Sequence, residues 1–260
     1  MLVTPFFVWI VSFCVVNCAL FALPRYAYPL AILVLLHFAI FAWGITSLRS
    51  QFFGKVYFRG KKNDPRIAIT FDDGPDPGLT GDILDMLDRY AMRATFFVIG
   101  RNVLRHPHIV KRAFQAGHVI ACHDLNHQWW SNFRMTSMVF RDILEARRIV
   151  DGVIGKKMLI YRPPMGLMNP HVPIALSRLN MSCVGWSKRL FDSGNKRLKK
   201  LYGMPALARP GAVILLHDCL PRPEHKKIFL EQFEKLLLAI RKQGLQAVGV
   251  DELLGLKAYG

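Results

Sequence analysis

The N-terminal part of the chain carries two apolar runs of 19 residues each, at about residues 5–23 and 27–45, and neither contains an Asp, Glu, Lys or Arg. An α-helix needs roughly 20 such residues to cross the hydrocarbon core of a bilayer. Prolines and tyrosines at residues 24–29 are typical of a turn at a membrane interface. We therefore expect residues 1–49 to form a transmembrane hairpin with two spans, in a bacterial cytoplasmic membrane.

A secretory signal peptide is the alternative interpretation of the same segment. Signal peptides begin with basic residues and end at a cleavage site of small residues, whereas this chain begins Met-Leu-Val-Thr-Pro. The hairpin is therefore favoured. His37, in the second run, is expected to lie at the interface between the two helices rather than to be functional.

Basic residues lie mainly on one side of this hairpin. The loop between the spans has only Arg25, whereas the segment after the second span holds Arg49, Lys55, Arg59, Lys61 and Lys62. Because loops rich in Lys and Arg stay in the cytoplasm, we expect the rest of the chain on the cytoplasmic side, with the extracytoplasmic side as the alternative. The five cysteines have no disulfide-framework spacing, which agrees with a reducing compartment.

The formal net charge is +17, and Arg25 and Arg49 are the only charged residues before position 51, so residues 51–260 carry the remaining +15. Residues 50–64 are interpreted as a basic connector and residues 65–260 as the folded domain. Attraction to anionic membrane lipids is one explanation of the charge, and recognition of a phosphate-bearing substrate is the other. Nucleic acid is not an expected partner, because the chain has no recognition-helix or stacking-sheet motif.

Short β-rich runs alternate with amphipathic stretches after residue 65. Helical spacing of apolar residues marks residues 135–150 and 229–242, and strand-like runs lie at residues 67–71, 94–99, 118–122, 158–161, 183–186, 212–216 and 246–250. This alternation favours an α/β fold with a mostly parallel sheet, either open or closed.

Residues suited to metal chemistry follow these strand-like runs. Asp72 and Asp73 end the first run, and in barrel-like α/β folds active-site residues gather at strand ends. His123 and His127 end the third run, and on one helical turn their spacing lets both imidazoles reach one ion. With an aspartate from the first run they would form a His₂-carboxylate site, the ligand pattern of catalytic zinc. The alternatives are a surface turn for the aspartates and a surface pair for the histidines.

Three later runs end in further candidates. Arg162 is followed by Pro163 and Pro164, which stiffen the backbone. Facing carboxylates, Arg162 would orient one of them, and the stiff loop could aim an N–H at a developing oxyanion. Another run ends in His217 and Asp218, and Trp186 is either core or a pocket wall.

These motifs together resemble those of a known family. Thr70–Pro75, His123 with His127, Arg162–Gly166, Trp186 and Leu215–His217 are similar in order and spacing to the five motifs of the polysaccharide deacetylases, carbohydrate esterase family 4. The resemblance covers about residues 65–255. It implies a distorted (β/α) barrel of about seven strands.

The resemblance also implies roles for individual residues. A divalent metal, expected to be zinc with cobalt or nickel as alternatives, would be bound by Asp73, His123 and His127. Asp72 would be the general base, Arg162 would hold it in place, and His217 would be the general acid. The oxyanion would lie near the Met165 N–H, and the substrate pocket would be formed by Met165, Pro164 and Trp186.

Two positions depart from the family pattern. Asp124 stands where the family usually has Ser or Thr, and it could be an additional metal ligand or a partner of one. Gly185 stands where the family often has the Asp that tunes the acid histidine, so Asp192 or Asp218 could take that role.

The expected reaction is metal-dependent hydrolysis of the N-acetyl group of an amino sugar. A cytoplasmic domain on a membrane hairpin favours a polyprenyl-phosphate-linked or otherwise membrane-linked N-acetylhexosamine, with membrane lipid as a partner. The alternatives are an extracytoplasmic deacetylase of peptidoglycan or exopolysaccharide and a catalytically inactive sugar-binding membrane protein. The six intact motif residues, Asp72, Asp73, His123, His127, Arg162 and His217, argue against the inactive protein.

Overall fold

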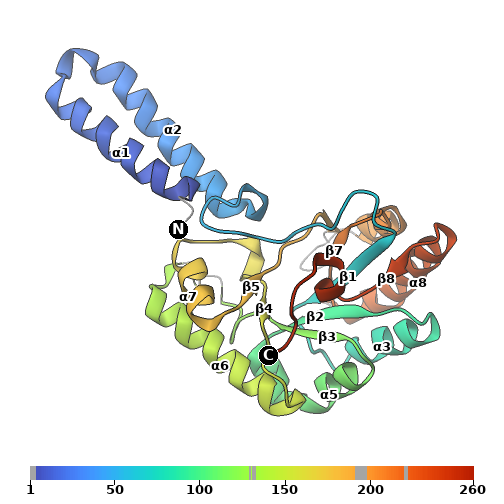
Figure 1. Ribbon diagram of the computed structural model, residues 1–260. Coiled ribbons are helices and arrows are strands. Elements are labelled where there is room, and N and C mark those ends of the chain that lie inside the picture. The colour runs from blue at the N-terminus through green and yellow to red at the C-terminus, as the bar shows by residue number, and fades with distance from the viewer. Residues whose placement is uncertain (1–3, 129, 131–132, 191–197, 220–221) are drawn as a thin grey trace.

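A computed structural model describes residues 4–128, 130, 133–190, 198–219 and 222–260. A helical hairpin projects from a rounded α/β domain (Figure 1). The hairpin consists of α1 (Pro5–Ala22), a short 3₁₀ turn (Pro24–Tyr26) and α2 (Ala27–Thr46). By length and composition, both helices are able to cross a membrane.

Polar contacts join the two helices of the hairpin at one level. His37 Nε2 lies 3.0 Å from Ser12 Oγ, and His37 Nδ1 lies 2.7 Å from the Leu33 carbonyl oxygen. The indole N–H of Trp9 donates to the His37 carbonyl at 3.0 Å. His37 is buried, so its place between the helices agrees with the sequence prediction.

Parallel strands form the centre of the domain. Seven strands lie in the order β5-β4-β3-β2-β1-β7-β6, and β8 pairs with the start of β1. Their bounds are β1 Arg66–Asp72, β2 Ala94–Val98, β3 Val119–Cys122, β4 Ile160–Tyr161, β5 Ser182–Cys183, β6 Lys188–Arg189, β7 Val213–His217 and β8 Gln246–Ala247. The sheet curls into a half-barrel, which confirms the predicted (β/α) barrel architecture.

Helices cover the outside of the curled sheet (Figure 1). They are α3 Thr80–Arg89, α4 Gly100–Arg105, α5 Pro107–Gln115, α6 Thr136–Ile154, α7 His171–Leu179 and α8 Lys226–Lys242. The short helix α9, Val250–Leu254, instead buries Val250 and Leu253 in the cluster on the other face of the sheet. Short 3₁₀ segments lie at Leu48–Ser50, Pro164–Gly166, Leu198–Leu207 and Pro223–His225.

The alternation of β1 positions its catalytic candidates. Side chains of a strand point alternately to the two faces of the sheet. Phe71 packs toward the helices, with ring centroids 5.2 Å from Phe96 and 5.5 Å from Phe233 of α8. Ala68 belongs to the separate cluster of buried residues on the other face. Thr70 and Asp72 share the parity of Ala68, so they point into the half-barrel.

Residues 50–64 pack on the domain, although the sequence suggested only a polar connector. Phe52, Phe53 and Val56 are buried. Tyr57 pairs with Val184 beyond β5, and Arg59 pairs with Ala212 before β7. The connector therefore links the edge strand β5 to β7, which lies next to the edge strand β6 on the other side of the sheet.

Candidate active site

The base of the site is a buried ion pair. Arg162 Nη1 donates to Asp72 Oδ1 at 2.6 Å and to Thr70 Oγ1 at 2.8 Å. Arg162 is fully buried, and Asp72 is only 3% exposed. Burial lowers the pKa of Arg162, and the Asp72 charge opposes that shift. The buried guanidinium therefore holds the Asp72 carboxylate in one orientation.

The rest of the Arg162 guanidinium is bound to the backbone after β5. Its Nη2 donates to the Gly185 carbonyl at 2.9 Å, and its Nε donates to the Val184 carbonyl at 3.2 Å. The cation also lies 3.8 Å from the centroid of the Phe97 ring. Gly185, which departs from the family pattern, therefore contributes through its carbonyl oxygen.

Three possible metal ligands converge beside this pair. Ligand atoms of Asp73, His123 and His127 all lie within 4.8 Å of one another. Asp73 Oδ1 lies 3.5 Å from His123 Nε2 and 3.3 Å from His127 Nε2. The sequence suggested that one helical turn brings the histidines together, but residues 123–127 form a loop in which Asp124 and His127 are left-handed, with φ of 76° and 51°.

The chemistry of this group fits a divalent cation. His123 Nδ1 lies 2.9 Å from the Arg162 carbonyl oxygen, which can only accept a hydrogen bond, so Nδ1 carries a proton and Nε2 is the nitrogen that faces Asp73. Asp73 Oδ1 is buried and has no hydrogen-bond partner among the described residues. Burial raises the pKa of Asp73, but His123, His127 and His217 outweigh it and hold that pKa well below its usual range. Two nitrogens and one carboxylate oxygen are the protein ligands of catalytic zinc sites.

His217 reaches the site from the strand beside β1. It ends β7 in register with Asp72, and its charge lowers the pKa of Asp73. Asp218, the next residue, is buried, and its Oδ2 accepts a hydrogen bond from Thr80 Oγ1 at 2.8 Å. Burial raises the pKa of Asp218 to about 7. The other suggested tuning residue, Asp192, lies outside the described residues.

A stiff loop and an indole ring pack together beside Arg162, whose guanidinium carbon lies 5.8 Å from the centroid of the Trp186 ring. Met165, between Pro164 and Gly166, adopts a left-handed conformation with φ 57° and ψ 3°. Gly166 has φ 68°, and a Cβ built on it would lie 2.1 Å from Trp186 Cη2. The Trp186 ring therefore packs directly over the Gly166 backbone, and the loop and the ring hold each other in place.

Asp124 is a buried residue of the 123–127 loop, and its carbonyl accepts a hydrogen bond from the Gly100 N–H at 3.0 Å. It lines a small cavity together with Arg134, Asp142 and Tyr161. Asp124 does not belong to the converging group of ligand atoms found among the described residues. Its position supports a role as a partner of the loop rather than as a metal ligand.

Some contacts at the site had no counterpart in the sequence motifs. Asn102 Nδ2 donates to the Asp73 carbonyl at 2.9 Å, and Thr80 holds Asp218. Thr70 belongs to the first motif, but it bonds to Arg162 because alternate side chains of β1 point into the half-barrel. Asn102 and Thr80 come from helices, where no motif identified them.

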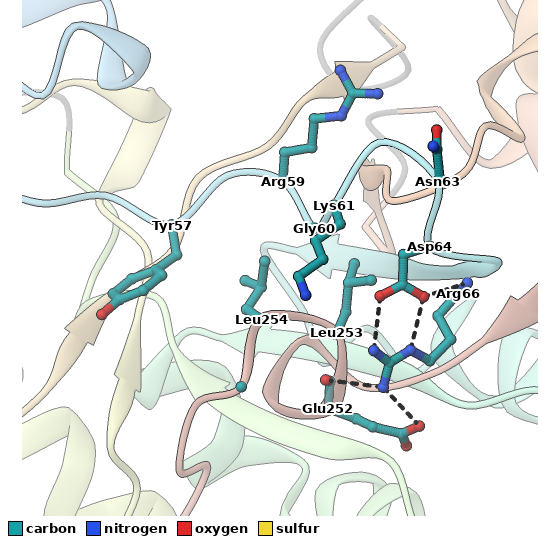
Figure 2. A pocket seen from close by; sticks show the side chains of 11 residues that line it. Tyr57, Arg59, Gly60, Lys61, Asn63, Asp64, Arg66, Glu252, Leu253 and Leu254 are labelled. Atoms are coloured by element: carbon teal, nitrogen blue, oxygen red, sulfur yellow. Dashed lines mark hydrogen bonds and ion pairs between the residues drawn. The ribbon is translucent and has the colours of Figure 1, made fainter.

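A larger pocket of about 680 Å³ lies at the opposite, amino end of β1. Figure 2 shows Arg66 pairing there with Asp64 and reaching Glu252. Arg59 and Lys61 also line it. The residues that line this pocket include no histidine, so it does not resemble a metal site. The catalytic candidates lie instead at the carboxyl ends of the strands, where active sites of (β/α) barrels are found.

A buried carboxylate, three converging candidate metal ligands and a nearby histidine on a curled parallel sheet fit a metal-dependent hydrolase of amide C–N bonds. A family model described as polysaccharide deacetylase matches residues 59–184. A peptidoglycan-N-acetylglucosamine deacetylase of Bacillus cereus is 34% identical over 207 residues, which cover 78% of this chain and 95% of that protein. The chain belongs to the polysaccharide deacetylase family, and the expected enzyme class, a carbohydrate deacetylase, is confirmed.

Two other relatives extend the comparison. A peptidoglycan-N-acetylglucosamine deacetylase of Listeria monocytogenes is 32% identical, and the match covers 75% of this chain but only 40% of that longer protein. The crystal structure of the Bc1960 peptidoglycan N-acetylglucosamine deacetylase superposes with a TM-score of 0.69 at 27% identity. That match covers 78% of this chain and 94% of the other.

Proposed function

We propose that this protein removes the acetyl group from an N-acetylhexosamine of the cell envelope that is attached to the membrane through a lipid phosphate. The observation that carries the reaction is that Asp72, the three candidate metal ligands and His217 lie together at the carboxyl ends of β1, β3 and β7. The names of the relatives support N-acetylhexosamine as the sugar. The two apolar helices and the basic connector support a substrate at the membrane surface.

Each residue of the site has its own role in the proposed reaction. A divalent metal bound by Asp73, His123 and His127 would polarise the acetyl carbonyl and lower the pKa of the attacking water. Asp72, held by Arg162, takes a proton from that water as its oxygen attacks the carbonyl carbon. The Met165 N–H donates to the developing oxyanion. His217 gives a proton to the leaving nitrogen, the C–N bond breaks, and acetate and a free amine result.

A polymeric substrate outside the membrane is the second candidate. The Bacillus and Listeria relatives are named for peptidoglycan, which favours it. The distribution of Lys and Arg around the hairpin favours the cytoplasmic side, where assembled peptidoglycan is absent. We therefore rank the membrane-linked sugar first.

Product analysis separates these candidates. The full-length protein in detergent, supplied with zinc, would be incubated separately with polyprenyl-phosphate-linked N-acetylglucosamine and with N-acetylated peptidoglycan fragments, and Asp72→Asn would be the inactive control. We expect the wild type to remove acetyl groups from the lipid-linked sugar in preference. Preferential deacetylation of the fragments would replace the first candidate with the second, and deacetylation of neither would contradict both.

A further inference from the structure

The end of the hairpin contacts the wall of the active site directly. We define the site wall as two segments, residues 164–168 and 184–187. The carbonyl of Ile45, in the last turn of α2, accepts a hydrogen bond from the Met168 N–H at 3.0 Å. Arg49, just after α2, donates through Nε to the Trp186 carbonyl at 3.4 Å and through Nη2 to the Ser187 carbonyl. Both segments of the wall are therefore bonded to the hairpin end.

An aromatic cluster fixes the hairpin to the connector. Phe53 has ring centroids 5.0 Å from Phe6 of α1 and 5.7 Å from Phe41 of α2. The Phe6 N–H donates to the Phe52 carbonyl at 3.1 Å. A larger side chain at position 44 would not fit beside this cluster, because a Cβ built on Gly44 would lie 2.4 Å from Phe52 Cδ1. Both helices are thus packed against residues 52–53.

The contacts continue from the hairpin end to the catalytic base. Leu48 is buried and lies 3.5 Å from a Cβ built on Gly185. The Gly185 N–H donates to the Tyr57 carbonyl at 2.8 Å, and the Gly185 carbonyl accepts from Arg162, which holds Asp72. A shift of the hairpin end would therefore move the wall before it reached the metal ligands.

We propose that the hairpin end is a positioning element of the deacetylase site. Ile45 and Arg49 hold the Met165 loop and the Trp186 ring in the shape that binds the sugar, so the site is complete only while the hairpin is docked. The role in catalysis rests on the proposed function. Because none of these contacts reaches Asp73, His123 or His127, undocking weakens substrate binding and leaves metal binding intact. A hairpin used in this way is also retained in the working protein rather than cleaved.

Gly44→Val tests the proposal in the full-length protein. The added side chain must displace Phe52, whereas Ala42→Val places the same side chain at an exposed position of the same helix and serves as the matched control. On a soluble N-acetylated chito-oligosaccharide we expect the KM of Gly44→Val to rise about tenfold with kcat and bound zinc little changed. The KM of Ala42→Val should equal that of the wild type. Equal kinetics for the two variants would overturn the proposal.

Hydrogen exchange gives a readout that does not depend on activity. Peptides covering residues 164–168 and 184–187 should exchange faster in Gly44→Val than in Ala42→Val, while peptides of β1 remain protected. Unchanged exchange of the wall peptides would overturn the proposal. This result can be read even if the wild type deacetylates no sugar and the proposed function is wrong.

A second pair of variants addresses Arg49 alone. We expect Arg49→Ala to raise KM, Arg49→Lys to restore part of the loss, and Arg59→Ala, which removes a connector charge away from the wall, to have no effect. A KM of Arg49→Ala equal to that of Arg59→Ala would assign no positioning role to Arg49.

Discussion

Arg162 Nη1 and Asp72 Oδ1 lie 2.6 Å apart in the interior of the half-barrel. A buried ion pair contributes little net stability, because the desolvation of both charges offsets their attraction. The same guanidinium also binds Thr70 and two backbone carbonyls. Because these bonds fix the guanidinium, its bond to Oδ1 fixes the orientation of the Asp72 carboxylate. Asp72 Oδ2 then faces His123 Nε2 at 3.7 Å. The pair is therefore best explained by orientation of the base.

Asp72→Asn should abolish most activity without removing the metal. The amide keeps the size of the carboxylate but cannot take a proton from water, so we expect kcat/KM to fall by about 10²–10⁴. Zinc content by elemental analysis should match the wild type, because Asp73, His123 and His127 are intact. Near-normal activity in this variant would show that another group acts as the base.

Removal of the metal should abolish the reaction reversibly. Dialysis against a chelator is expected to remove activity, and addition of zinc should restore it. The buried Asp73 Oδ1 has no hydrogen-bond partner in the described part of the chain, so it is available to the metal. Asp73→Asn should bind zinc more weakly, by about 10-fold or more. Thr46→Ala, at an exposed end of α2, is the control for the mutation itself. Full activity in metal-free protein would contradict the assigned site.

The sequence predicted the fold class and the members of the site because each motif follows a strand, and the carboxyl ends of parallel strands lie together. It could not predict how His123 and His127 converge, since their loop depends on the left-handed backbone of Asp124 and His127. Nor could it predict that Asn102 binds the Asp73 carbonyl, because that contact joins a helix to a distant strand end. Residues 50–64 were interpreted as a basic connector because their charges are visible in the sequence, whereas the burial of Phe52 and Phe53 is not.

Gly166→Ala should damage the sugar-binding wall. Its left-handed φ of 68° is strained for alanine by about 1–2 kcal/mol, and the new methyl group would meet the Trp186 ring. We expect a raised KM and a lower melting temperature. In the double variant with Trp186→Leu, the smaller side chain removes the clash, so the melting temperature should partly recover while KM stays high. If the losses of stability of Gly166→Ala and Trp186→Leu simply add in the double variant, the clash with Trp186 is not the cause of the Gly166→Ala effect.

His118 should make the domain less stable in acid. Burial, and next the nearby Arg93 charge, lower the pKa of His118 to about 4, and its Nδ1 accepts a hydrogen bond from the Ala94 N–H at 3.2 Å. The folded pKa lies below that of the unfolded chain, about 6.5, so the unfolded state binds the proton more readily. The stability from neutral His118 is present above pH 6.5 and is lost as the pH falls toward 4, up to roughly 3 kcal/mol.

Denaturant unfolding at pH 7.5, 5.5 and 4.5 measures this contribution. His118→Asn keeps an acceptor near the Ala94 N–H but does not titrate, whereas His108→Asn replaces an exposed histidine of α5 and is the matched control. We expect the wild type and His108→Asn to lose more unfolding free energy between pH 7.5 and 4.5 than His118→Asn does. Because carboxylates titrate in all three proteins, their effect cancels in the comparison. Parallel pH profiles for the two variants would mean that His118 does not become protonated on unfolding.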